Sequence, residues 1–370
     1  MNIKVCSRCL MDETADLISF NNEGCCNYCE DFENKNNNFI QTTNKKNIEI
    51  LLNKLKNNKN HYDCIIGVSG GIDSSYTLAK CVELGLRPLA VHMDNGWNSS
   101  LAQNNISNLV RALNIDLITH VVNWKEYRSL MNSFFKSNVI DIELLYDHAM
   151  LAVNYKLANK FKIKNIIAGT NRSTEGFEMP KNWNWFKYDK KNIISINNKF
   201  NKIKIKTFPF ISIYQYIYYR IFKNIKWISI LDYLDYNKDE AKLYLVNNFN
   251  FIPYPYKHYE SVFTRLYQGY ILPKKFNVDK RKIHLSNLIM TNQITREDGI
   301  KKLKESPYPS NLALKTDINF FLKKMNWTKN NFTDYLKQSE VKHDFYNNDY
   351  HIWKKIILIK NLYIWIKKFL

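Results

Sequence analysis

The chain has 370 residues, 45% of them hydrophobic and 14% aromatic, so it has ample material for a large core and a disordered protein is excluded. Its net charge of +20 is typical of proteins that bind a polyanion, but the lysines are spread along the chain among many Asn and Ile residues, so a general compositional bias is the favoured explanation of the charge. No apolar run of about 18 residues and no secretory signal core are visible, so we expect a cytoplasmic protein without a transmembrane segment.

Five of the seven cysteines lie within the first 29 residues. Cys6 and Cys9 form one Cys-x-x-Cys pair, and Cys26 and Cys29 form a second pair after sixteen intervening residues. Two such pairs can complete a tetrahedron of thiolates, so the spacing predicts a structural Zn²⁺ site and leaves Cys25 as a spare. A disulfide pair or an iron–sulfur cluster are the alternatives, and a cytoplasmic location disfavours disulfides.

The other two cysteines, Cys64 and Cys81, lie in a strand pattern and a helix pattern, where a buried small apolar residue is the simplest interpretation. No cysteine follows Cys81. Enzymes that relay sulfur as a protein persulfide need an accessible cysteine near the nucleotide, so the absence weakens a thiolation hypothesis.

Residues 34–60 are polar and indicate a linker followed by a short helix near residues 48–55. From about residue 61, compact apolar runs alternate with helical periodicity. The predicted elements in chain order are strand 64–68, helix 73–84, strand 88–93, helix 101–113, strand 117–122, helix 144–161 and strand 165–168. This alternation predicts parallel βαβ units with right-handed crossovers, and therefore a doubly wound α/β sheet.

Ligands bind such sheets at the carboxyl ends of the strands. We therefore expect the ligand site at the loops that follow the strands, residues 69–75, 92–98, 123–126 and 169–176. After about residue 235 the strand signal fades. The later periodic segments, 239–249, 297–304, 318–325 and 353–370, predict helices. We therefore divide the chain into a four-cysteine module (1–35), a nucleotide-binding domain (36–235) and a mostly helical C-terminal region (236–370).

The two most apolar stretches, 208–222 and 356–370, are interrupted by Arg and Lys. For the second of them, an interfacial helix and a core or subunit-contact helix are both compatible with the sequence, and the latter is the commoner case.

The segment between the first strand and its helix has the pattern Ser-Gly-Gly-x-Asp-Ser-Ser, contributed by Ser69, Gly70, Gly71, Asp73, Ser74 and Ser75. Two glycines allow a tight turn that exposes backbone N–H groups, and the helix N-terminus adds partial positive charge. The segment therefore predicts an anion-binding loop, although it is not a Walker A loop because the Gly-Lys-[Ser/Thr] ending is missing. An ordinary turn with an Asp cap is the alternative.

This loop resembles the PP-loop of the N-type ATP pyrophosphatases, whose fold is of the adenine nucleotide alpha-hydrolase type. The resemblance implies that the loop holds the pyrophosphate released when ATP is split between its α and β phosphates, and that Asp73 organises Mg²⁺. It also implies that His92, Asp94 and Asn95, after the second strand, and Gly169, Thr170 and Asn171, after the fourth, lie near the nucleotide. Plain turns of small polar residues would produce each of these two segments singly.

The whole chain resembles a narrower group, the N-acetyl sugar amidotransferase family of surface polysaccharide and flagellar sugar biosynthesis. The resemblance rests on the paired Cys-x-x-Cys segments, the PP-loop, Val-His-x-Asp-Asn-Gly-Trp-Asn, Asp-His-Ala, Thr-Glu-Gly and Phe-Pro. It rests most of all on Lys-His-Tyr-Glu-Ser-x-x-Thr-Arg (257–265), followed by Tyr-Gln-Gly-Tyr-Ile-Leu-Pro (267–273). It covers about residues 4–305. Pro255-Tyr256 before this block and residues 142–146 before Asp-His depart from the family pattern, which leaves the substrate open.

The resemblance implies an enzyme that adenylates the acetamido oxygen of a nucleotide-activated N-acetyl sugar and replaces that oxygen with ammonia. AMP and pyrophosphate leave, and a separate glutaminase subunit supplies the ammonia. Lys257 and Arg265 are then candidates for stabilising phosphates, and His258 or Glu260 for moving protons. A solvated lysine and a helix cap or ion pair are the ordinary alternatives for Lys257 and Glu260.

Two other functions compete with this interpretation. A tRNA-modifying PP-loop enzyme, either a thiolase or a lysidine-type ligase, would use the basic charge, whereas the amidotransferase hypothesis predicts no nucleic-acid partner. A non-enzymatic scaffold with a degenerate nucleotide fold is the third possibility, and the intact PP-loop argues against it.

Overall fold

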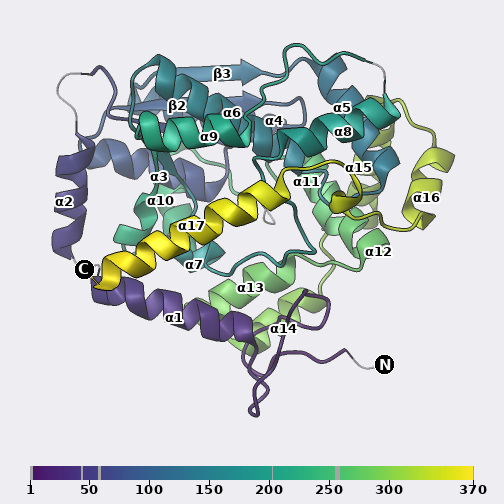
Figure 1. Cartoon of the computed structure of the whole chain (residues 1–370), viewed down its shortest axis with the longest axis horizontal. Helices are drawn as coiled ribbons and strands as arrows, with labels where there is room; N and C mark the ends of the chain where they lie inside the picture. The colour runs from purple at the N-terminus through teal and green to yellow at the C-terminus, as the bar shows by residue number, and fades with distance from the viewer. Residues whose placement is uncertain (1–2, 43–44, 57–59, 202, 255–258, 370) are drawn as a thin grey trace.

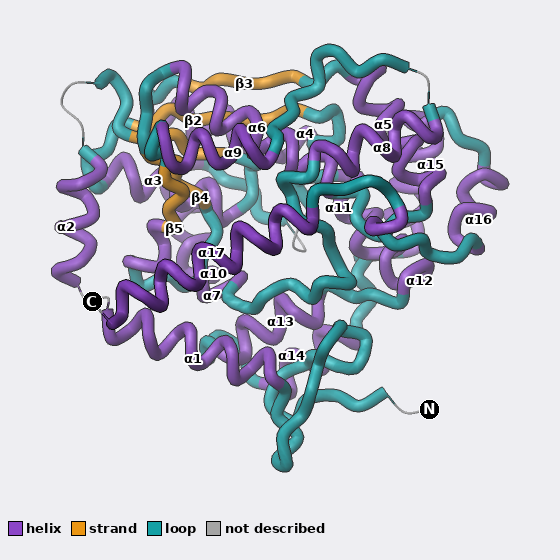
Figure 2. Tube along the Cα trace, viewed as in Figure 1, coloured by secondary structure: helices purple, strands orange, loops and turns teal. Residues whose placement is uncertain are grey.

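The computed structural model describes residues 3–42, 45–56, 60–201, 203–254 and 259–369. A sheet of five parallel strands forms its centre, in the order β3-β2-β1-β4-β5 (orange in Figure 2). The strands are β1 (Cys64–Gly67), β2 (Pro88–Asp94), β3 (Leu117–Val121), β4 (Asn165–Ala168) and β5 (Lys226–Ser229). The predicted doubly wound α/β sheet is thereby confirmed.

Helices cover both faces of the sheet because successive side chains of a strand point to opposite faces. Ile65 of β1 and Ile166 of β4 lie in one core, whereas their neighbours Ile66 and Ile167 lie in a second core. The helices up to β5 are α1 (Asn27–Thr42), α2 (Lys45–Leu55), α3 (Ile72–Glu83), α4 (Ser100–Leu113), α5 (Trp124–Ser137), α6 (Leu144–Lys160), α7 (Arg172–Glu175), α8 (Lys190–Phe200) and α9 (Ile213–Ile217). The apolar strands are thus buried on both sides, as in other parallel sheets.

The region after β5 is helical, as predicted, and Figure 1 shows it wrapping around the lower and right-hand sides of the sheet. Its helices are α10 (Lys238–Phe249), α11 (Val262–Leu266), α12 (Leu272–Phe276), α13 (Arg281–Met290), α14 (Arg296–Lys304), α15 (Asn311–Met325), α16 (Lys329–Lys337) and α17 (Tyr350–Phe369). Among the described residues, no helix is both long and apolar enough to cross a membrane.

The first four strands and the helices α3, α4 and α6 lie where the periodicity predicts them, within one or two residues. The prediction of a linker from residue 34 is wrong up to Thr42, because α1 continues that far. The sequence analysis also missed β5, the short helices α7, α9, α11 and α12, and the longer helices α5, α8, α13 and α16. β5 is a four-residue edge strand with half-buried side chains, so it has neither the length nor the apolar run that would mark it.

The predicted boundary between the cysteine module and the nucleotide-binding domain, at residue 35, lies inside α1. Phe32 of this helix stacks on Phe177, which follows α7, with ring centroids 5.2 Å apart. The module and the sheet domain are therefore joined by a continuous helix that packs against both, and the three-part division of the chain stays a prediction.

Candidate active site

A cavity of about 500 Å³ opens at the carboxyl ends of β1, β2 and β4. In the sheet, β1 lies between β2 and β4. The chain adds β2 and β3 on one side of β1 and then crosses to add β4 and β5 on its other side, so the switch point lies between β1 and β4. Such a switch point leaves a crevice beyond the strand ends, because the two flanking loops diverge to opposite faces. The cavity lies at this crevice, where the sequence predicted nucleotide binding.

The predicted phosphate loop forms the floor of the cavity. Gly70 has φ +83°, and a Cβ atom there would lie 2.8 Å from the carbonyl oxygen of Ala102, so only glycine fits. The hydroxyl groups of Ser69 and Ser74 lie 3.1 Å apart, and the Ser69 hydroxyl accepts from the Gly71 N–H. These bonds hold the turn at the N-terminus of α3, where the first N–H groups have no partner within the helix.

The end of β4 lies directly against this helix start. A Cβ atom on Gly169 would lie 2.8 Å from the backbone nitrogen of Ser74, so the close approach requires glycine. The neighbouring Thr170 bonds through its hydroxyl to the hydroxyl of Ser229 on β5, at 2.9 Å. The loops after β1 and β4 therefore meet at one wall of the cavity.

Two carboxylates flank the loop. Asp73, in the first turn of α3, accepts a hydrogen bond from the hydroxyl of Tyr236. Burial, and then the Asp73 charge, raise the pKa of Tyr236 above its ordinary value, so this hydroxyl remains a donor at neutral pH. A Cβ atom on Gly71 would lie 3.6 Å from Oε1 of Glu260, which places that carboxylate beside the loop from the opposite side.

The segment before α11 reaches the loop because it is bonded to the turn after β2. The Ser99 N–H donates to the carbonyl oxygen of Glu260 at 2.8 Å, and the Val262 N–H donates to that of Trp97 at 2.9 Å. The Tyr254 hydroxyl donates to the carbonyl oxygen of Gly70 at 2.9 Å. Residues more than 180 positions apart in the chain are thus fixed next to each other.

About half of the predicted nucleotide-site residues line the cavity. Those that line it are Ser69, Gly71, Asp73, Ser74, Gly169, Thr170 and Glu260. Those that do not line it are Gly70, Ser75, His92, Asp94, Asn95, Asn171 and Arg265. Lys257 and His258 lie outside the described residues.

The predicted residues outside the cavity support the loops instead. His92 is buried between the carbonyl oxygen of Val68 (2.8 Å) and the side-chain amide of Asn98 (3.0 Å). Asn171 caps α7 by accepting from the Thr174 N–H. Asp94 accepts from the Gly96 N–H at 2.7 Å, and Asn95 is buried and accepts from the Trp97 N–H. These bonds shape the turns that border the cavity.

Arg265 forms a bidentate ion pair with Asp317 on α15, and its guanidinium lies over the ring of Tyr259 at 5.1 Å. Asp317 is 3% exposed and also accepts from the Tyr308 hydroxyl at 3.1 Å. The arginine therefore joins α11 to α15 rather than facing the cavity.

The sequence analysis missed the cavity's cations and its apolar wall. Lys238 and Lys242 of α10 and Lys302 of α14 line the cavity. The apolar wall includes Met150, Val153, Ile167 and Trp227. The three lysines and Trp227 come from helix faces and the edge strand β5, which have no local motif. Met150, Val153 and Ile167 lie on α6 and β4, where hydrophobic periodicity carried a signal.

Asn154 also lines the cavity and is 2% exposed. Its amide donates to the carbonyl oxygen of Met150 at 2.8 Å, whereas its Oδ1 has no partner among the described residues. A buried acceptor without a donor is costly, so an external donor at this position would be stabilised.

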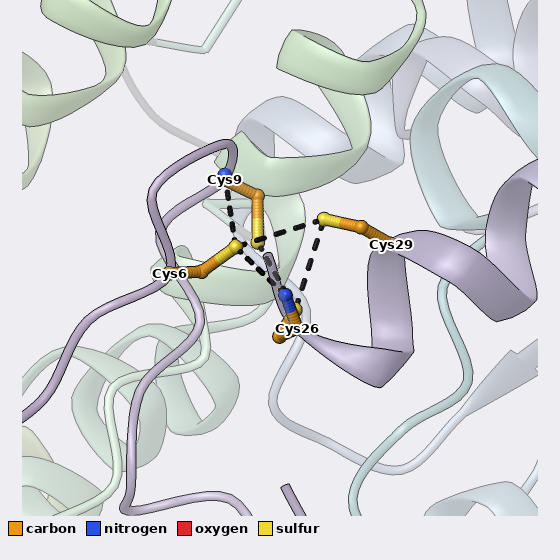
Figure 3. A group of neighbouring side chains, drawn as sticks. All are labelled: Cys6, Cys9, Cys26 and Cys29. Atoms are coloured by element: carbon orange, nitrogen blue, oxygen red, sulfur yellow. Dashed lines mark hydrogen bonds between the residues drawn. The ribbon is translucent and has the colours of Figure 1, made fainter. Parts of the chain in front are cut away.

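The four predicted ligand cysteines come together near the N-terminus, and Figure 3 shows their sulfur atoms pointing toward one another from a loop and from the start of α1. All four are fully buried, and their sulfur atoms lie within 4.8 Å of one another, with several pairs at 3.7–3.9 Å. A tetrahedral Zn²⁺ ion with Zn–S bonds of about 2.3 Å needs sulfur atoms about 3.8 Å apart. The arrangement fits one such ion, and Cys25 lies outside the group.

This cysteine cluster is attached to the helices that close the cavity. Arg296 of α14 donates to the carbonyl oxygens of Cys6 (2.9 Å) and Cys9 (3.3 Å), and Lys282 of α13 pairs with Asp12. α13 and α14 in turn contribute Leu288, Gln293, Ile294 and Lys302 to the cavity lining or its connecting turn. The cysteine cluster thus contacts the two helices, α13 and α14, that contribute to the cavity lining.

Two segments of the chain match known protein families. Residues 44–177 match the NAD synthase family, and residues 260–360 match the family described as LPS biosynthesis protein WbpG-like, C-terminal domain. The two matched segments support the resemblance to a PP-loop ATP pyrophosphatase with a WbpG-like C-terminal domain.

Individual proteins similar to this chain are distant from it in sequence. The uncharacterized protein MJ1599 of Methanocaldococcus jannaschii is 30% identical over 133 residues, which is 35% of this chain and 46% of that protein, so the chain spans about half of this curated relative. The NH3-dependent NAD synthetase of Campylobacter jejuni is 14% identical, with 71% and 98% of the two chains covered and a TM-score of 0.30. For the U34-tRNA thiolase NcsA of Methanococcus maripaludis these values are 14%, 86%, 89% and 0.34.

Proposed function

We propose that this protein adenylates the acetamido oxygen of a nucleotide-activated N-acetyl sugar and replaces it with ammonia, forming an acetamidino sugar in the synthesis of a bacterial surface polysaccharide or flagellar sugar. Support comes from one arrangement above all. The WbpG-like region contributes Glu260, Leu288 and Lys302 to the same cavity whose floor is the phosphate loop. Residues from the segment that matches a family linked to LPS biosynthesis therefore line the same cavity as the phosphate loop.

Binding of ATP follows from the chemistry of the cavity wall. The N-terminus of α3 suits the β and γ phosphates, and Lys238, Lys242 and Lys302 add positive charge. The apolar wall suits a purine base, whose exocyclic amine can donate to Oδ1 of Asn154. Asp73 would hold Mg²⁺, which neutralises phosphate charge when bound.

In the proposed reaction, the acetamido oxygen attacks the α phosphorus and the bond to the bridging oxygen breaks, so pyrophosphate leaves toward the loop. Ammonia then adds to the imidate carbon, a proton leaves the nitrogen, and the C–O bond breaks to release AMP. Glu260 lies beside the loop and is our candidate to accept that proton, with His258 as the second candidate. Lys257 is proposed to stabilise phosphate charge, because it belongs to the same block of sequence.

Three further assignments are part of this proposal. The ammonia comes from a separate glutaminase subunit, as the resemblance to the N-acetyl sugar amidotransferases implies. The four-cysteine cluster binds Zn²⁺, since its sulfur spacing fits one tetrahedral ion. No nucleic acid takes part, and the cysteines in the sheet domain, Cys64 and Cys81, are fully buried and unsuited to carry a persulfide.

The test is mass spectrometry of one reaction mixture. Purified protein is combined with ATP, Mg²⁺, ammonium and a panel of nucleotide-activated acetamido sugars, with bulk tRNA in a parallel tube. We expect one sugar to exchange oxygen for NH while AMP and pyrophosphate appear. Asp73→Asn should lower the rate by about a hundredfold, whereas Asp334→Asn, an exposed carboxylate on α16, should not change it. Unchanged sugars together with modified tRNA would replace this proposal with tRNA modification.

A further inference from the structure

Two stretches of the chain contain no acidic residue. Residues 190–231 include nine Lys or Arg and no Asp or Glu, and residues 350–370 include five Lys and no Asp or Glu. At the average frequency of 34 acidic residues in 370, a stretch of 42 residues would contain about four. The positive charge of the protein is therefore partly segregated, even though lysines occur throughout.

These two acid-free stretches lie on the same side of the folded protein. The ring of Trp353 on α17 lies 5.9 Å from that of Tyr216 on α9 and 5.4 Å from that of Tyr188. Figure 1 shows α17 crossing the front of the molecule in yellow, with α9 above it. Segments far apart in the sequence thus combine into one basic face, which we call the α9–α17 face (the exposed side chains of residues 214–226 and 354–359).

Large apolar side chains project from this face into solvent. Exposed apolar residues recur at helical spacing on α9 and on the helical turn that continues it (Tyr218–Phe222), namely Tyr214, Tyr218, Ile221 and Phe222. Ile221 and Phe222 are 68% and 76% exposed. On α17, Leu358 and Ile359 are 69% and 66% exposed. The sequence after residue 359 continues with Leu, Tyr, Ile and Trp residues between lysines.

Basic side chains surround these apolar ones. Arg220, Lys226 and Lys354 are exposed, and Lys223 lies over the ring of Tyr218 at 5.4 Å. Repulsion between these cations would be relieved by an anionic partner.

We propose that the α9–α17 face docks on an anionic lipid surface. Exposed aromatic and branched aliphatic side chains flanked by Lys and Arg, without nearby acids in sequence, have the chemistry of interfacial membrane segments. The apolar tips would enter the boundary between headgroups and acyl chains, and the cations would contact lipid phosphates. This mode needs no spanning helix, in agreement with the absence of one among the described residues.

A nucleic acid is the main alternative partner for a basic face. It would be bound by cations along a groove with aromatic rings available for stacking. Among the five most exposed large apolar side chains of the face, three are aliphatic (Ile221, Leu358 and Ile359) and two are aromatic (Tyr214 and Phe222). Aliphatic side chains gain free energy in hydrocarbon but not against a phosphate backbone, so the observations favour lipid.

The experiment is co-sedimentation of the full chain with vesicles of phosphatidylcholine, with and without one-third phosphatidylglycerol. We expect binding to the anionic vesicles alone. Ile221→Ser/Phe222→Ser should weaken the partition coefficient by about tenfold, and Lys226→Glu/Lys354→Glu should weaken it similarly at low salt. All four positions are exposed, so circular dichroism and thermal melting should match the parent protein.

Matched controls carry the same changes elsewhere. Leu17→Ser/Leu312→Ser removes two aliphatic side chains that are 70% and 74% exposed. Lys329→Glu/Lys337→Glu inverts two exposed charges on α16. Neither pair should alter vesicle binding. Equal losses in control and face variants would overturn the proposal. So would salt-sensitive tRNA binding without vesicle binding, or a dimer in light scattering that the Ile221/Phe222 variant dissociates.

Discussion

Arg265 lies on α11 and forms an ion pair across the contact with α15. Its place in the Lys-His-Tyr-Glu-Ser-x-x-Thr-Arg block suggested a phosphate contact. In the structure its guanidinium is bidentate with Asp317, which also holds the Tyr308 hydroxyl, and it does not line the cavity. Because Asp317 is almost fully buried, its charge needs this arginine.

We predict that Arg265→Met lowers the free energy of unfolding by about 3 kcal/mol, because it leaves the Asp317 charge buried without a partner. The double variant Arg265→Met/Asp317→Leu should regain most of this loss, since both charges are then removed. Urea unfolding of the three proteins measures both effects.

The kinetic parameters of the double variant separate a structural role from a phosphate contact. We expect its ATP turnover to lie within about threefold of the parent, because the pair acts through the contact between α11 and α15. A stable double variant with turnover reduced by two orders of magnitude would show instead that Arg265 acts on the nucleotide.

At the scale of elements, the cysteine cluster matters because of what it touches. A small module with two knuckles cannot bury enough surface to fold by itself and depends on its metal. Here Arg296 and Lys282 attach the cluster to α14 and α13, which contribute residues to the cavity lining. A metal ion held by the cluster would therefore stabilise the helices that shape the cavity.

We predict that Cys9→Ser, or removal of the metal by a strong chelator, lowers the melting temperature and raises the KM for ATP more than it lowers kcat. The reason is that α13 and α14 lose the surface on which they rest. Metal analysis, thermal melting and steady-state kinetics give the three readouts.

Cys25→Ser is the matched control, because Cys25 is adjacent in sequence to Cys26 but lies outside the cluster. It should retain one metal ion per chain and unchanged kinetics. Loss of metal from this variant, or a metal-free Cys9→Ser protein with normal stability, would contradict the assignment.

At the scale of the whole molecule, two buried histidines connect distant segments. His148 of α6 donates from Nδ1 to the carbonyl oxygen of Lys187 at 2.7 Å and accepts the Ile211 N–H at Nε2. His343 bonds to Asn192 and accepts the N–H of Asp141. Burial lowers the pKa of His148 to about 4 and that of His343 to about 3, so both are neutral in the folded protein.

In the unfolded chain each histidine would titrate near about 6.5. The folded state therefore binds fewer protons, and stability is complete above that pH and decreases as the pH falls toward 4. At pH 5 the two groups together should cost about 4 kcal/mol relative to pH 7.5. Urea unfolding at pH 7.5, 6 and 5 measures the slope.

His343→Gln should be less stable at pH 7.5, because its two hydrogen bonds are disturbed, but should lose less stability on acidification. Asp141 opposes the lowered pKa of His343 and Lys187 favours it, so both must stay in place for this comparison. His61→Gln, at an exposed position, is the control and should keep the parental slope. A parental slope in His343→Gln would show that other groups govern the acid response.

Local sequence determined a large part of this protein. The first four strands, the helices α3, α4 and α6, the turn at the start of α3 and the grouping of four cysteines could be predicted because each depends on residues close together in the chain: a compact apolar run, two glycines before a helix, or two Cys-x-x-Cys turns. The sequence as a whole resembles the N-acetyl sugar amidotransferase family, and residues 260–360 match the WbpG-like C-terminal domain.

Only the tertiary structure decided which residues share the cavity. Lys242, Lys302 and Asn154 line the cavity, whereas His92 and Arg265 support the structure around it. These roles depend on contacts between segments more than a hundred residues apart, or on which side of a loop faces the cavity. The tertiary structure likewise joined two acid-free stretches into the α9–α17 face. Periodicity and motifs describe neighbours along the chain, whereas a cavity or a surface is defined by neighbours in space.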